Sequence, residues 1–469
     1  MKLTIIGAGP GGYSAAFAAA KAGVEVTLVE RAKLGDTGCI PTKTLRSSAD
    51  VLEMSGRLAE FGITGECALK ADMPAIVNRK RKVTATLQTG LEKTCAQLKV
   101  RVVYGKAELV SAKLVRVTTA EGTEEVESDN VIIATGSSPL ELPALPVDHA
   151  RVLSSDDALE LQAVPPSLII VGGGVIGCEL AFIYRAFGSK VTVVEGQNRV
   201  LPLPSVDEEI SRLLQREMKK KGIAVELART VTATTPTGTG VSVEIGASPF
   251  VEVANPPAPR TLEADAVCVT VGRVPHTDGL GLDAAGVKVD ARGWIEADDF
   301  LETSVPGVYA IGDCVFGKAQ LAHTASAMGE VAAENIMGIP AVYDEKTNPT
   351  CVYMEPEAAS VGLTEEQCKA KGIDYKVGKF PLVANGKSLI INGGEGLVKI
   401  IADAKYEEVL GMHIIGPRAT DLIAEGALAL RLEATVDELI STIHSHPTVS
   451  ESVRECALNV QKRAIHIKN

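Results

Sequence analysis

Residues 2–30 read KLTIIGAGPGGYSAAFAAAKAGVEVTLVE, and this stretch decides the fold. Its apolar start predicts a buried strand, its glycine-rich segment a tight turn, its small residues a helix, and VTLVE a second strand. A strand, a helix and a second strand in this order form a βαβ unit. The G-x-G-x-x-G spacing assigns Gly7 to the turn, Gly9 to the close approach of a pyrophosphate, and Gly12 to the helix–strand contact.

An acidic residue closes this unit. Glu30 ends the second strand, 18 residues after Gly12. A carboxylate at this place accepts hydrogen bonds from ribose hydroxyls, while the N-terminus of the helix favours the phosphates. The unit therefore predicts a dinucleotide site.

The same pattern occurs a second time at residues 168–195, LIIVGGGVIGCELAFIYRAFGSKVTVVE. Its motif glycines are Gly172, Gly174 and Gly177, and Glu195 again follows the last of them by 18 residues. One such motif is weak evidence, but two copies with strand, helix, second strand and acid predict two sites. Glu195 repels a 2′-phosphate and accepts from a free 2′-hydroxyl, which favours NAD over NADP. Arg199, close by, weakens that preference slightly.

Length and composition agree with a large folded protein. The chain has 469 residues, enough for about three domains. A hydrophobic fraction of 46% excludes a disordered chain, and a net charge of −12 argues against nucleic acid as a partner. Nine cysteines without a short-spaced framework indicate a reducing compartment, so we expect a cytoplasmic protein.

Two apolar runs could be mistaken for targeting or membrane segments. The N-terminal run follows Lys2 like a secretory signal, but the glycines from Gly7 to Gly12 would break a signal helix. The run from 168 to 187 contains three successive glycines and Glu179, which is costly inside a bilayer. The sequence therefore predicts no membrane segment.

The intervening segments suggest further strands and a third domain. Residues 100–131 alternate like an antiparallel insertion before a buried strand at 131–134, and the proline-containing segment 137–148 is typical of a linker. Strands are also expected within 230–260, at 266–271, near 352 and within 398–415, and helices at 422–432 and 449–460.

With these motifs, the sequence resembles the class I FAD-dependent pyridine nucleotide-disulfide oxidoreductases, and within them the dihydrolipoamide dehydrogenase branch. Nearly the whole chain takes part. Besides the two glycine motifs, the segments that carry the resemblance are Ala134–Ser137, Val271–Pro275, Ala310–Asp313, Leu321–His323, Pro356–Glu357 and His444–Thr448. The resemblance implies an α/β fold with two Rossmann-like dinucleotide-binding domains, for FAD and NAD, and a C-terminal α+β dimerisation domain. The expected boundaries are 1–145 and 271–342 for FAD, 146–270 for NAD, and 343–469 for the interface.

The resemblance also implies the cofactor contacts. The residues expected to bind FAD and NAD are Gly7, Gly9, Gly12, Glu30, Lys43, Ala107, Thr135, Gly136, Ser137, Gly312, Asp313, Ala322, Gly172, Gly174, Gly177, Glu195 and Gly272. Asp313 would contact the ribitol and pyrophosphate side of the flavin nucleotide, with Ala322 and residues 135–137 contributing mainly backbone. His276 stands where the family often has Asn. No resident metal is expected.

The redox segment departs from the family pattern Cys-x4-Cys-Ile-Pro-x-Lys. Residues 38–43, GCIPTK, keep its second half, but the first cysteine and about four neighbours are missing, and Leu34 stands where the spacing requires sulfur. By resemblance, Cys39 is the flavin-proximal sulfur, and the absent partner is the one that exchanges with substrate. Cys67 and Cys95 could rebuild a disulfide in space, although both are more typical of ordinary packing residues.

Four further residues complete the expected catalytic set with Cys39. Lys43 resembles the lysine beside the flavin, and Glu179 resembles its ion-pair partner. His446 resembles the acid/base histidine that a second copy contributes in a homodimer, and Glu451 the carboxylate that orients it. The competing interpretations of His446 are a helix cap and a metal ligand, for which His444 and His446 supply only two groups.

The sequence thus predicts an FAD-dependent NADH oxidoreductase with single-cysteine chemistry. Hydride passes from NADH to FAD, and Cys39 forms a mixed disulfide or persulfide with a small thiol, disulfide or lipoyl-type substrate, which an external thiol resolves. One alternative is direct transfer from the flavin to oxygen, a quinone, a metal ion or a nicotinamide. Another is a catalytically reduced FAD-binding scaffold subunit.

Overall fold

The computed structural model describes residues 1–35, 38–65 and 68–469. The chain divides into two compact units, of which the first comprises residues 1–44, 78–140 and 272–343. The second comprises residues 45–77, 141–271 and 344–469. Boundaries between the units fall within helix α2 (Cys39–Ser55) and helix α3 (Met73–Gln97). The three ligand-based domain boundaries expected from the sequence stay a prediction.

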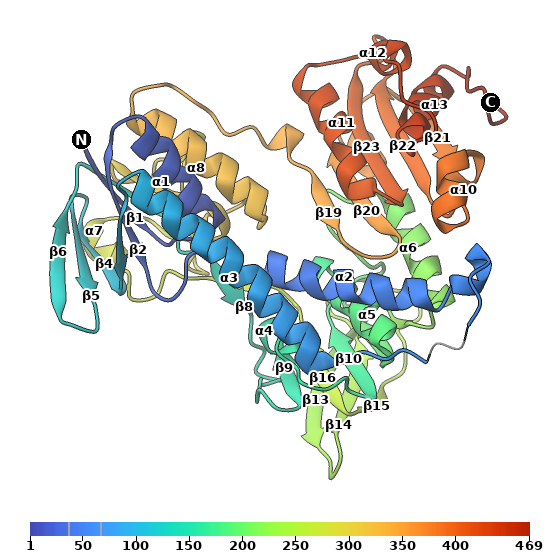
Figure 1. The fold of residues 1–469 in the computed structure, drawn as a ribbon, viewed down its shortest axis with the longest axis horizontal. Helices are drawn as coiled ribbons and strands as arrows, with labels where there is room; N and C mark the ends of the chain where they lie inside the picture. The colour runs from blue at the N-terminus through green and yellow to red at the C-terminus, as the bar shows by residue number, and fades with distance from the viewer. Residues whose placement is uncertain (36–37, 66–67) are drawn as a thin grey trace. The chain divides into compact units, whose positions relative to one another are not determined.

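A parallel five-stranded sheet forms the centre of the first unit. Its order is β18 (Val308–Ala310), β7 (Asn130–Ile133), β1 (Lys2–Ile6), β2 (Glu25–Glu30) and β3 (Arg101–Tyr104). Strand β1 pairs with β2 on one side and β7 on the other, and such a switch point opens a crevice at the carboxyl ends of the strands. Helices α1 (Pro10–Lys21) and α8 (Ala322–Ile336) lie side by side (Figure 1). The predicted βαβ unit is therefore present.

Smaller elements complete the first unit. Strands β4 (Lys106–Ser111), β5 (Leu114–Thr118) and β6 (Thr123–Glu127) form the predicted antiparallel insertion. The expected linker at 137–148 begins with structure, because β8 (Ser137–Pro139) pairs with β17 (Arg273–Pro275). Prolines end both three-residue strands, so the pairing stops there. The unit also contains α7 (Leu282–Ala285) and the 3₁₀ turn η2 (Gly312–Cys314).

The second unit repeats the βαβ arrangement. Its parallel sheet has the order β12 (Ala224–Glu226), β11 (Lys190–Val194), β10 (Ser167–Val171), β16 (Ala266–Val269) and β9 (Val152–Ser154). The helices of this part are α5 (Val175–Phe187), α6 (Glu208–Lys220) and the short α4 (Ser155–Ala158). An antiparallel sheet of β13 (Arg229–Pro236), β14 (Val241–Ala247) and β15 (Arg260–Ala264) accounts for the strands predicted within 230–260.

The C-terminal part of the second unit is built on an antiparallel sheet. Its order is β19 (Thr350–Val352), β20 (Glu357–Gly362), β23 (Val409–Gly416), β22 (Leu397–Asp403) and β21 (Tyr375–Pro381). Helix α11 (Ala419–Arg431) packs on β20 and β23, and α13 (Glu451–Val460) packs on β21 and β22 (Figure 1). The remaining helices are α9 (Glu365–Ala370), α10 (Gly386–Asn392) and α12 (Val436–Ser441), and the 3₁₀ turns are η1 (Leu58–Phe61), η3 (Glu345–Thr347) and η4 (Leu382–Ala384).

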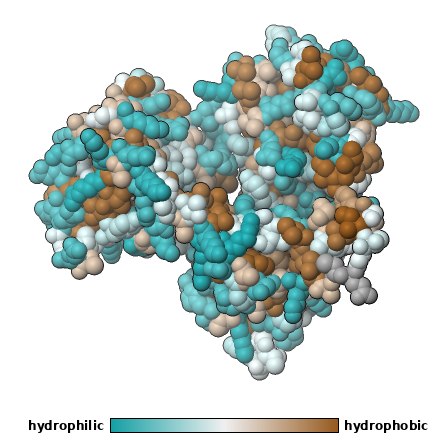
Figure 2. Space-filling view, in the orientation of Figure 1, coloured by the Kyte–Doolittle hydropathy of each residue, from teal (hydrophilic) through white to brown (hydrophobic). Residues whose placement is uncertain are grey.

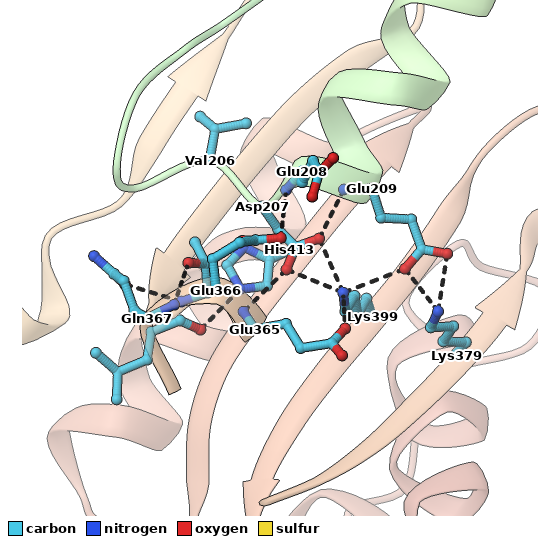
Figure 3. Close-up of polar contacts among 12 residues, drawn as sticks. Val206, Asp207, Glu208, Glu209, Glu365, Glu366, Gln367, Lys379, Lys399 and His413 are labelled. Carbon is cyan, nitrogen blue, oxygen red and sulfur yellow. Dashed lines mark hydrogen bonds and ion pairs between the residues drawn. The ribbon is translucent and has the colours of Figure 1, made fainter. Parts of the chain in front are cut away.

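A buried ionic cluster joins α6 to the C-terminal sheet within this unit (Figure 3). Lys399 on β22 is 1% exposed, and its Nζ lies 2.9 Å from Oδ1 of Asp207, which is fully buried. The same Nζ lies 2.7 Å from Oε2 of Glu365. Asp207 also accepts from the amide of Glu209 and so caps α6. Each buried charge therefore has an opposite charge and further hydrogen bonds, which buried ions require.

The pKa directions follow from this pairing. Burial opposes ionisation of Glu365, but hydrogen bonds from Lys399 and Lys369 lower the pKa of Glu365 to about 2. Burial lowers the pKa of His413 on β23 and outweighs the Asp207 carboxylate, which raises it. The positive charge of Lys399 lowers the pKa of His413 further. The Nε2 of His413 donates to the carbonyl of Leu363 at 3.0 Å, and its buried Nδ1 has no hydrogen-bond partner among the described residues. The folded protein thus holds His413 neutral.

We expect His413 to make the protein less stable in mild acid. The unfolded chain takes up a proton on this imidazole below about pH 6.5, whereas the folded chain resists it, so stability is lost as the pH falls from 7 to 5. One such proton changes the free energy of unfolding by up to about 1.4 kcal/mol per pH unit. The substitution His413→Gln keeps a donor for Leu363 and should flatten this slope, measured as urea midpoints against pH.

The matched control is His149→Gln, because the His149 side chain is 68% exposed. This control should leave the slope between pH 5 and 7 close to that of the unmodified protein. Equal slopes in the His413 variant and the unmodified protein would contradict the prediction.

Candidate functional site

The glycine turn of the first unit leaves no room for larger residues. Gly7 has φ +105°, and a Cβ placed there would lie 2.3 Å from the carbonyl oxygen of Ala134. A Cβ on Gly12 would lie 1.9 Å from the carbonyl oxygen of Gly7. Gly9 differs, because no described atom lies within 4 Å of its Cβ position. It caps α1 without a side-chain hydrogen bond, which suits a helix N-terminus that receives phosphate.

Glu30 is fixed beside this turn. Its Oε2 accepts from the amide of Ala8 at 2.8 Å, and its Oε1 accepts from the amide of Ala32 at 2.8 Å. The carboxylate is therefore oriented at the carboxyl end of β2 before any ligand binds. This arrangement fits the ribose and pyrophosphate of a dinucleotide.

The second turn repeats the first in detail. A Cβ on Gly177 would lie 1.9 Å from the carbonyl oxygen of Gly172, whose φ is +106°. Glu195 accepts from the amide of Gly173 at 2.6 Å and from that of Gln197 at 2.7 Å. Gly174 caps α5 without a side-chain hydrogen bond. The second turn therefore fits a dinucleotide as well.

Arg199 is occupied in the structure. Its guanidinium donates to the carbonyls of Val206 at 3.0 Å and Leu203 at 3.2 Å. An arginine that binds its own loop is less available to pair with a 2′-phosphate. Arg199 therefore offers less opposition to the preference for NAD that Glu195 predicts, and that preference stays a prediction.

Asp313 lies in a polar network within the first unit. Its Oδ2 accepts from the hydroxyl of Ser137 at 2.7 Å, and Nε of Arg273 donates to the same hydroxyl at 2.7 Å. His276 supports the neighbouring segment, because Nδ1 of His276 lies 3.1 Å from the carbonyl oxygen of Thr135 and its amide donates to the carbonyl of Gly136. Three segments expected at the flavin thus meet at one place: 135–137, 273–276 and 313.

The other residues expected to bind the flavin either adjoin Asp313 and Arg273 in sequence or lie on the neighbouring elements α8 and β4. Gly312 precedes Asp313 with φ +71°, and Gly272 precedes Arg273 with φ +137°. Ala322 is the first residue of α8, whose cap has no side-chain hydrogen bond. Ala107 on β4 is buried, so its contribution to a cofactor site would come from backbone. The cofactor roles of all these residues stay predictions.

The thiol of Cys39 occupies a helix N-terminus. Cys39 is the first residue of α2 and is exposed, and Lys43 follows one turn later on the same helix. A helix N-terminus and a nearby ammonium both favour the thiolate. Leu34, at the place where the family spacing requires sulfur, is buried in the hydrophobic core of the first unit.

Cys95 and Cys67 are the two cysteines that could pair with Cys39. Cys95 on α3 is buried in the same core, and burial raises the pKa of its thiol. These are the properties of a packing residue. Cys67 lies outside the described residues, as do residues 36 and 37 of the contracted segment.

Glu179 lies buried on α5 and accepts from the amide of Tyr353 at 3.0 Å. Glu179 and Tyr353 both belong to the second unit, so the carboxylate is held there by its own unit. Lys43 belongs to the first unit. The expected ion pair between Lys43 and Glu179 stays a prediction.

His446 and Glu451 are paired. Nδ1 of His446 lies 3.0 Å from Oε1 of Glu451, and Oε2 of Glu451 accepts from the amide of Thr448 at 2.8 Å. Partial burial raises the pKa of Glu451, but these hydrogen bonds outweigh it and hold the pKa below its usual value. The His446 side chain is 82% exposed, so the rest of the imidazole is open to a proton donor or acceptor. The pair can therefore hold one tautomer and exchange a proton at Nε2.

A neighbouring pair supports the loop that carries His446. Nε2 of His444 lies 2.8 Å from Oε1 of Glu425, and Nδ1 lies 3.0 Å from the carbonyl oxygen of Thr442. The hydrogen bond with Glu425 raises the pKa of His444. Sequence reasoning missed Glu425, because it lies 19 residues away on α11. With both ring nitrogens engaged, His444 has a structural role, and no group of three or more metal-ligating side chains occurs in the described part of the chain.

Comparison with known proteins identifies the family. Residues 1–329 match the pyridine nucleotide-disulphide oxidoreductase family, and residues 348–457 match its dimerisation domain. The chain belongs to the pyridine nucleotide-disulphide oxidoreductases.

Within that family, the similar proteins include dihydrolipoyl dehydrogenases. The chain is 40% identical to that of Geobacillus stearothermophilus, over 99% of this chain and 97% of the relative. It is 41% identical to the dihydrolipoyl dehydrogenase of Chlorobaculum parvum, over 97% of this chain and 96% of the relative. Among solved structures, LpdA from Mycobacterium tuberculosis is 29% identical with a TM-score of 0.89, covering 97% of this chain and 99% of that one. The HOCl-induced flavoprotein disulfide reductase RclA from Escherichia coli is 28% identical with a TM-score of 0.84, covering 97% and 99%.

These matches confirm the predicted fold class, the cofactors FAD and NAD, and the class of enzyme. The chain is an FAD-dependent NADH oxidoreductase that resembles dihydrolipoyl dehydrogenases and acts on a sulfur group. None of the helices in the described residues is long and apolar enough to span a bilayer.

The pairing of His446 with Glu451 predicts the effect of Glu451→Gln. The substituted amide can still contact the imidazole but cannot stabilise the imidazolium, so kcat/KM for disulfide reduction should fall by about 10- to 100-fold. Because the imidazolium is the proton donor in disulfide reduction, the alkaline limb of the pH–rate profile should move to lower pH, which steady-state kinetics between pH 5 and 9 would reveal. NADH oxidation by ferricyanide, which needs no thiol protonation, should be unaffected.

Glu433→Gln is the matched control, since Glu433 is an exposed glutamate of the same C-terminal part. This variant should keep the rate and pH profile of the unmodified enzyme. A Glu451→Gln enzyme with an unchanged profile would show that the pair takes no part in proton transfer.

Proposed function

We propose that the enzyme reduces a small disulfide or lipoyl-type substrate through the single thiol of Cys39, with His446 and Glu451 of a second copy as the acid/base pair. The observation that carries this proposal is the pairing of His446 with Glu451 at 3.0 Å on an exposed imidazole. An oriented acid/base imidazole has a task when a thiolate leaves, and direct transfer to a non-sulfur acceptor gives it none.

The proposed cycle begins with attack of the Cys39 thiolate on one sulfur of the substrate RS–SR′. The substrate S–S bond breaks, the Cys39–S–S–R bond forms, and R′S⁻ leaves with the electron pair. Nε2 of His446 gives this thiolate its proton, while Glu451 stabilises the imidazolium before the proton is transferred. The first product is R′SH.

The mixed disulfide must then be reduced. FAD and NADH, when bound, supply two electrons. With one proton, these electrons split the Cys39–S–S–R bond into the Cys39 thiolate and RSH. An external thiol alone would only exchange one disulfide for another, so consumption of NADH requires this reduction. In the cycle as a whole, NADH, a proton and RS–SR′ give NAD⁺, RSH and R′SH.

Anaerobic titration of the FAD-loaded protein with NADH tests the number of redox groups. Without a disulfide beside the flavin, we expect uptake of two electrons, bleaching of the flavin and no persistent long-wavelength absorption band. Uptake of four electrons with a persistent band would show that a second sulfur has been recruited to Cys39, and would contradict the single-thiol cycle.

Variants of two cysteines complete this test. Cys39→Ser should retain NADH oxidation with ferricyanide and lose reduction of disulfides to background, because serine is a poor nucleophile towards sulfur. Cys351→Ser is the control, since Cys351 is a half-buried cysteine of the second unit and should retain both activities. Unchanged activity of Cys39→Ser towards the physiological acceptor would favour a non-sulfur acceptor, and absence of NADH oxidation in the unmodified protein would favour a scaffold.

The proposed cycle requires a homodimer. The matched dimerisation domain covers residues 348–457, and exposed apolar side chains gather within it. Val383, Leu389 and Ile390 lie around α10, where Figure 2 shows apolar surface. Ile443, beside the histidine pair, is 96% exposed. Exposed apolar patches of this kind mark protein–protein contacts.

Substitution of Ile443 by aspartate should weaken the dimer. If Ile443 is buried in the interface, its burial contributes about 1.5–3 kcal/mol to dimer formation. Replacing it by a charged side chain should therefore raise the dimer dissociation constant at least about tenfold. Sedimentation equilibrium measures this change, and disulfide reduction should fall in parallel at low protein concentration. Ile339→Asp, an exposed isoleucine of the first unit, is the control. A dimer of unchanged strength in Ile443→Asp would place the interface elsewhere.

A further inference from the structure

An aromatic ring lies beside the second dinucleotide turn. Phe250 belongs to the loop between β14 and β15, and its side chain is 67% exposed. A Cβ placed on Gly196 would lie 3.0 Å from Cδ2 of the Phe250 ring. Gly196 directly follows Glu195, the carboxylate fixed at the second turn. The exposed ring therefore stands at the end of the strand where the ribose is expected.

Hydrogen bonds fix the loop at both ends. The amide of Ser248 donates to the carbonyl of Ala228 at 2.9 Å, and the amide of Ala228 donates to the carbonyl of Gln197 at 2.8 Å. The amide of Phe250 donates to the hydroxyl of Ser248 at 3.1 Å. At the far end, Arg229 donates to the carbonyl of Ala258 at 2.8 Å. These bonds hold both ends of the loop that carries Phe250 beside the segment that follows Glu195.

The same loop borders an open, shallow hollow of about 500 Å³. Its lining includes Ser248, Val251, Glu252 and Pro256, a mixture of apolar and polar groups. This volume lies in the range of small-molecule sites. An exposed aromatic ring beside Gly196, next to the carboxylate expected to bind ribose, suits a flat heteroaromatic base.

We infer that Phe250 and the loop 247–256 form the adenine subsite of the second dinucleotide site, where the ring stacks on the adenine of NAD(H). The inference rests on the proposed assignment of NAD to the turn at Gly172–Gly177. Stacking on an aromatic side chain is worth about 1–3 kcal/mol per base and covers apolar surface that the free enzyme exposes. The carboxylate of Glu195 disfavours a 2′-phosphate on the adjoining ribose.

Calorimetry on the FAD-loaded enzyme tests this inference with two fragments of NAD. ADP-ribose contains the adenine, and nicotinamide mononucleotide does not. Phe250→Ala should raise the dissociation constant of ADP-ribose by about tenfold, the loss of one base stack. Binding of nicotinamide mononucleotide should be unchanged, and Phe250→Trp should restore ADP-ribose binding. In kinetics, the KM for NADH should rise while kcat is retained.

Two further variants make the outcomes distinct. Phe300→Ala removes an exposed phenylalanine of the first unit and should leave ADP-ribose binding unchanged. Glu195→Ala should weaken ADP-ribose binding if the second turn holds NAD. Weaker binding in Glu195→Ala with normal binding in Phe250→Ala would overturn the adenine subsite alone. Normal binding in both would overturn the assignment of NAD to this turn.

Discussion

Both candidate nucleotide sites depend on a close contact between a helix and the strand before it. Only glycine is small enough to allow this contact. In each βαβ unit a side chain at the last motif glycine would overlap the carbonyl oxygen of the first one, at 1.9 Å. Removing the side chain lets the helix begin directly at the end of the strand, so that its free amides face the crevice. The carboxylate at the end of the second strand then reaches back to the turn, and it does so in both copies. One local packing rule thus places a helix N-terminus and a carboxylate at fixed separation, the arrangement that the phosphate and the ribose of a dinucleotide would need.

Features that arise from neighbouring residues could be predicted from the sequence. The glycine turns, their strands and the acids that close them all follow from spacing within about 30 residues. The pair of His446 and Glu451 was also accessible, because five residues of chain separate its members. For the same reason the antiparallel strands within 100–131 and 230–260 could be expected. In each case one segment contains both the groups that interact and the turn that brings them together.

Other features depend on contacts between distant segments, and sequence patterns carry no signal for them. Lys399 and Asp207 are 192 residues apart, yet they form the centre of the buried cluster. The placement of Phe250 beside Gly196 depends on a loop without regular structure, held by hydrogen bonds to the segment after β12. Prolines predict a linker at 137–148, whereas β8 at its start pairs with β17, which lies more than 130 residues away in the chain. Contacts between segments that are distant in the chain, rather than local composition, determine all three.

The contracted redox segment has one feature that the sequence shows and another that only the structure shows. The sequence shows what is missing, and the structure shows that Leu34 is packed in the core rather than presented as a reactive group. The remaining thiol stands at the first residue of α2, where helix amides favour its ionised form. In the proposed cycle, the thiolate of Cys39 attacks the substrate disulfide and keeps half of the substrate bound to it. That cycle would require room for a covalent adduct whose size is set by the substrate, whereas an internal disulfide has a constant size. Because the segment lacks the first cysteine and about four neighbours of the family pattern, we expect the contraction to make room for such an adduct.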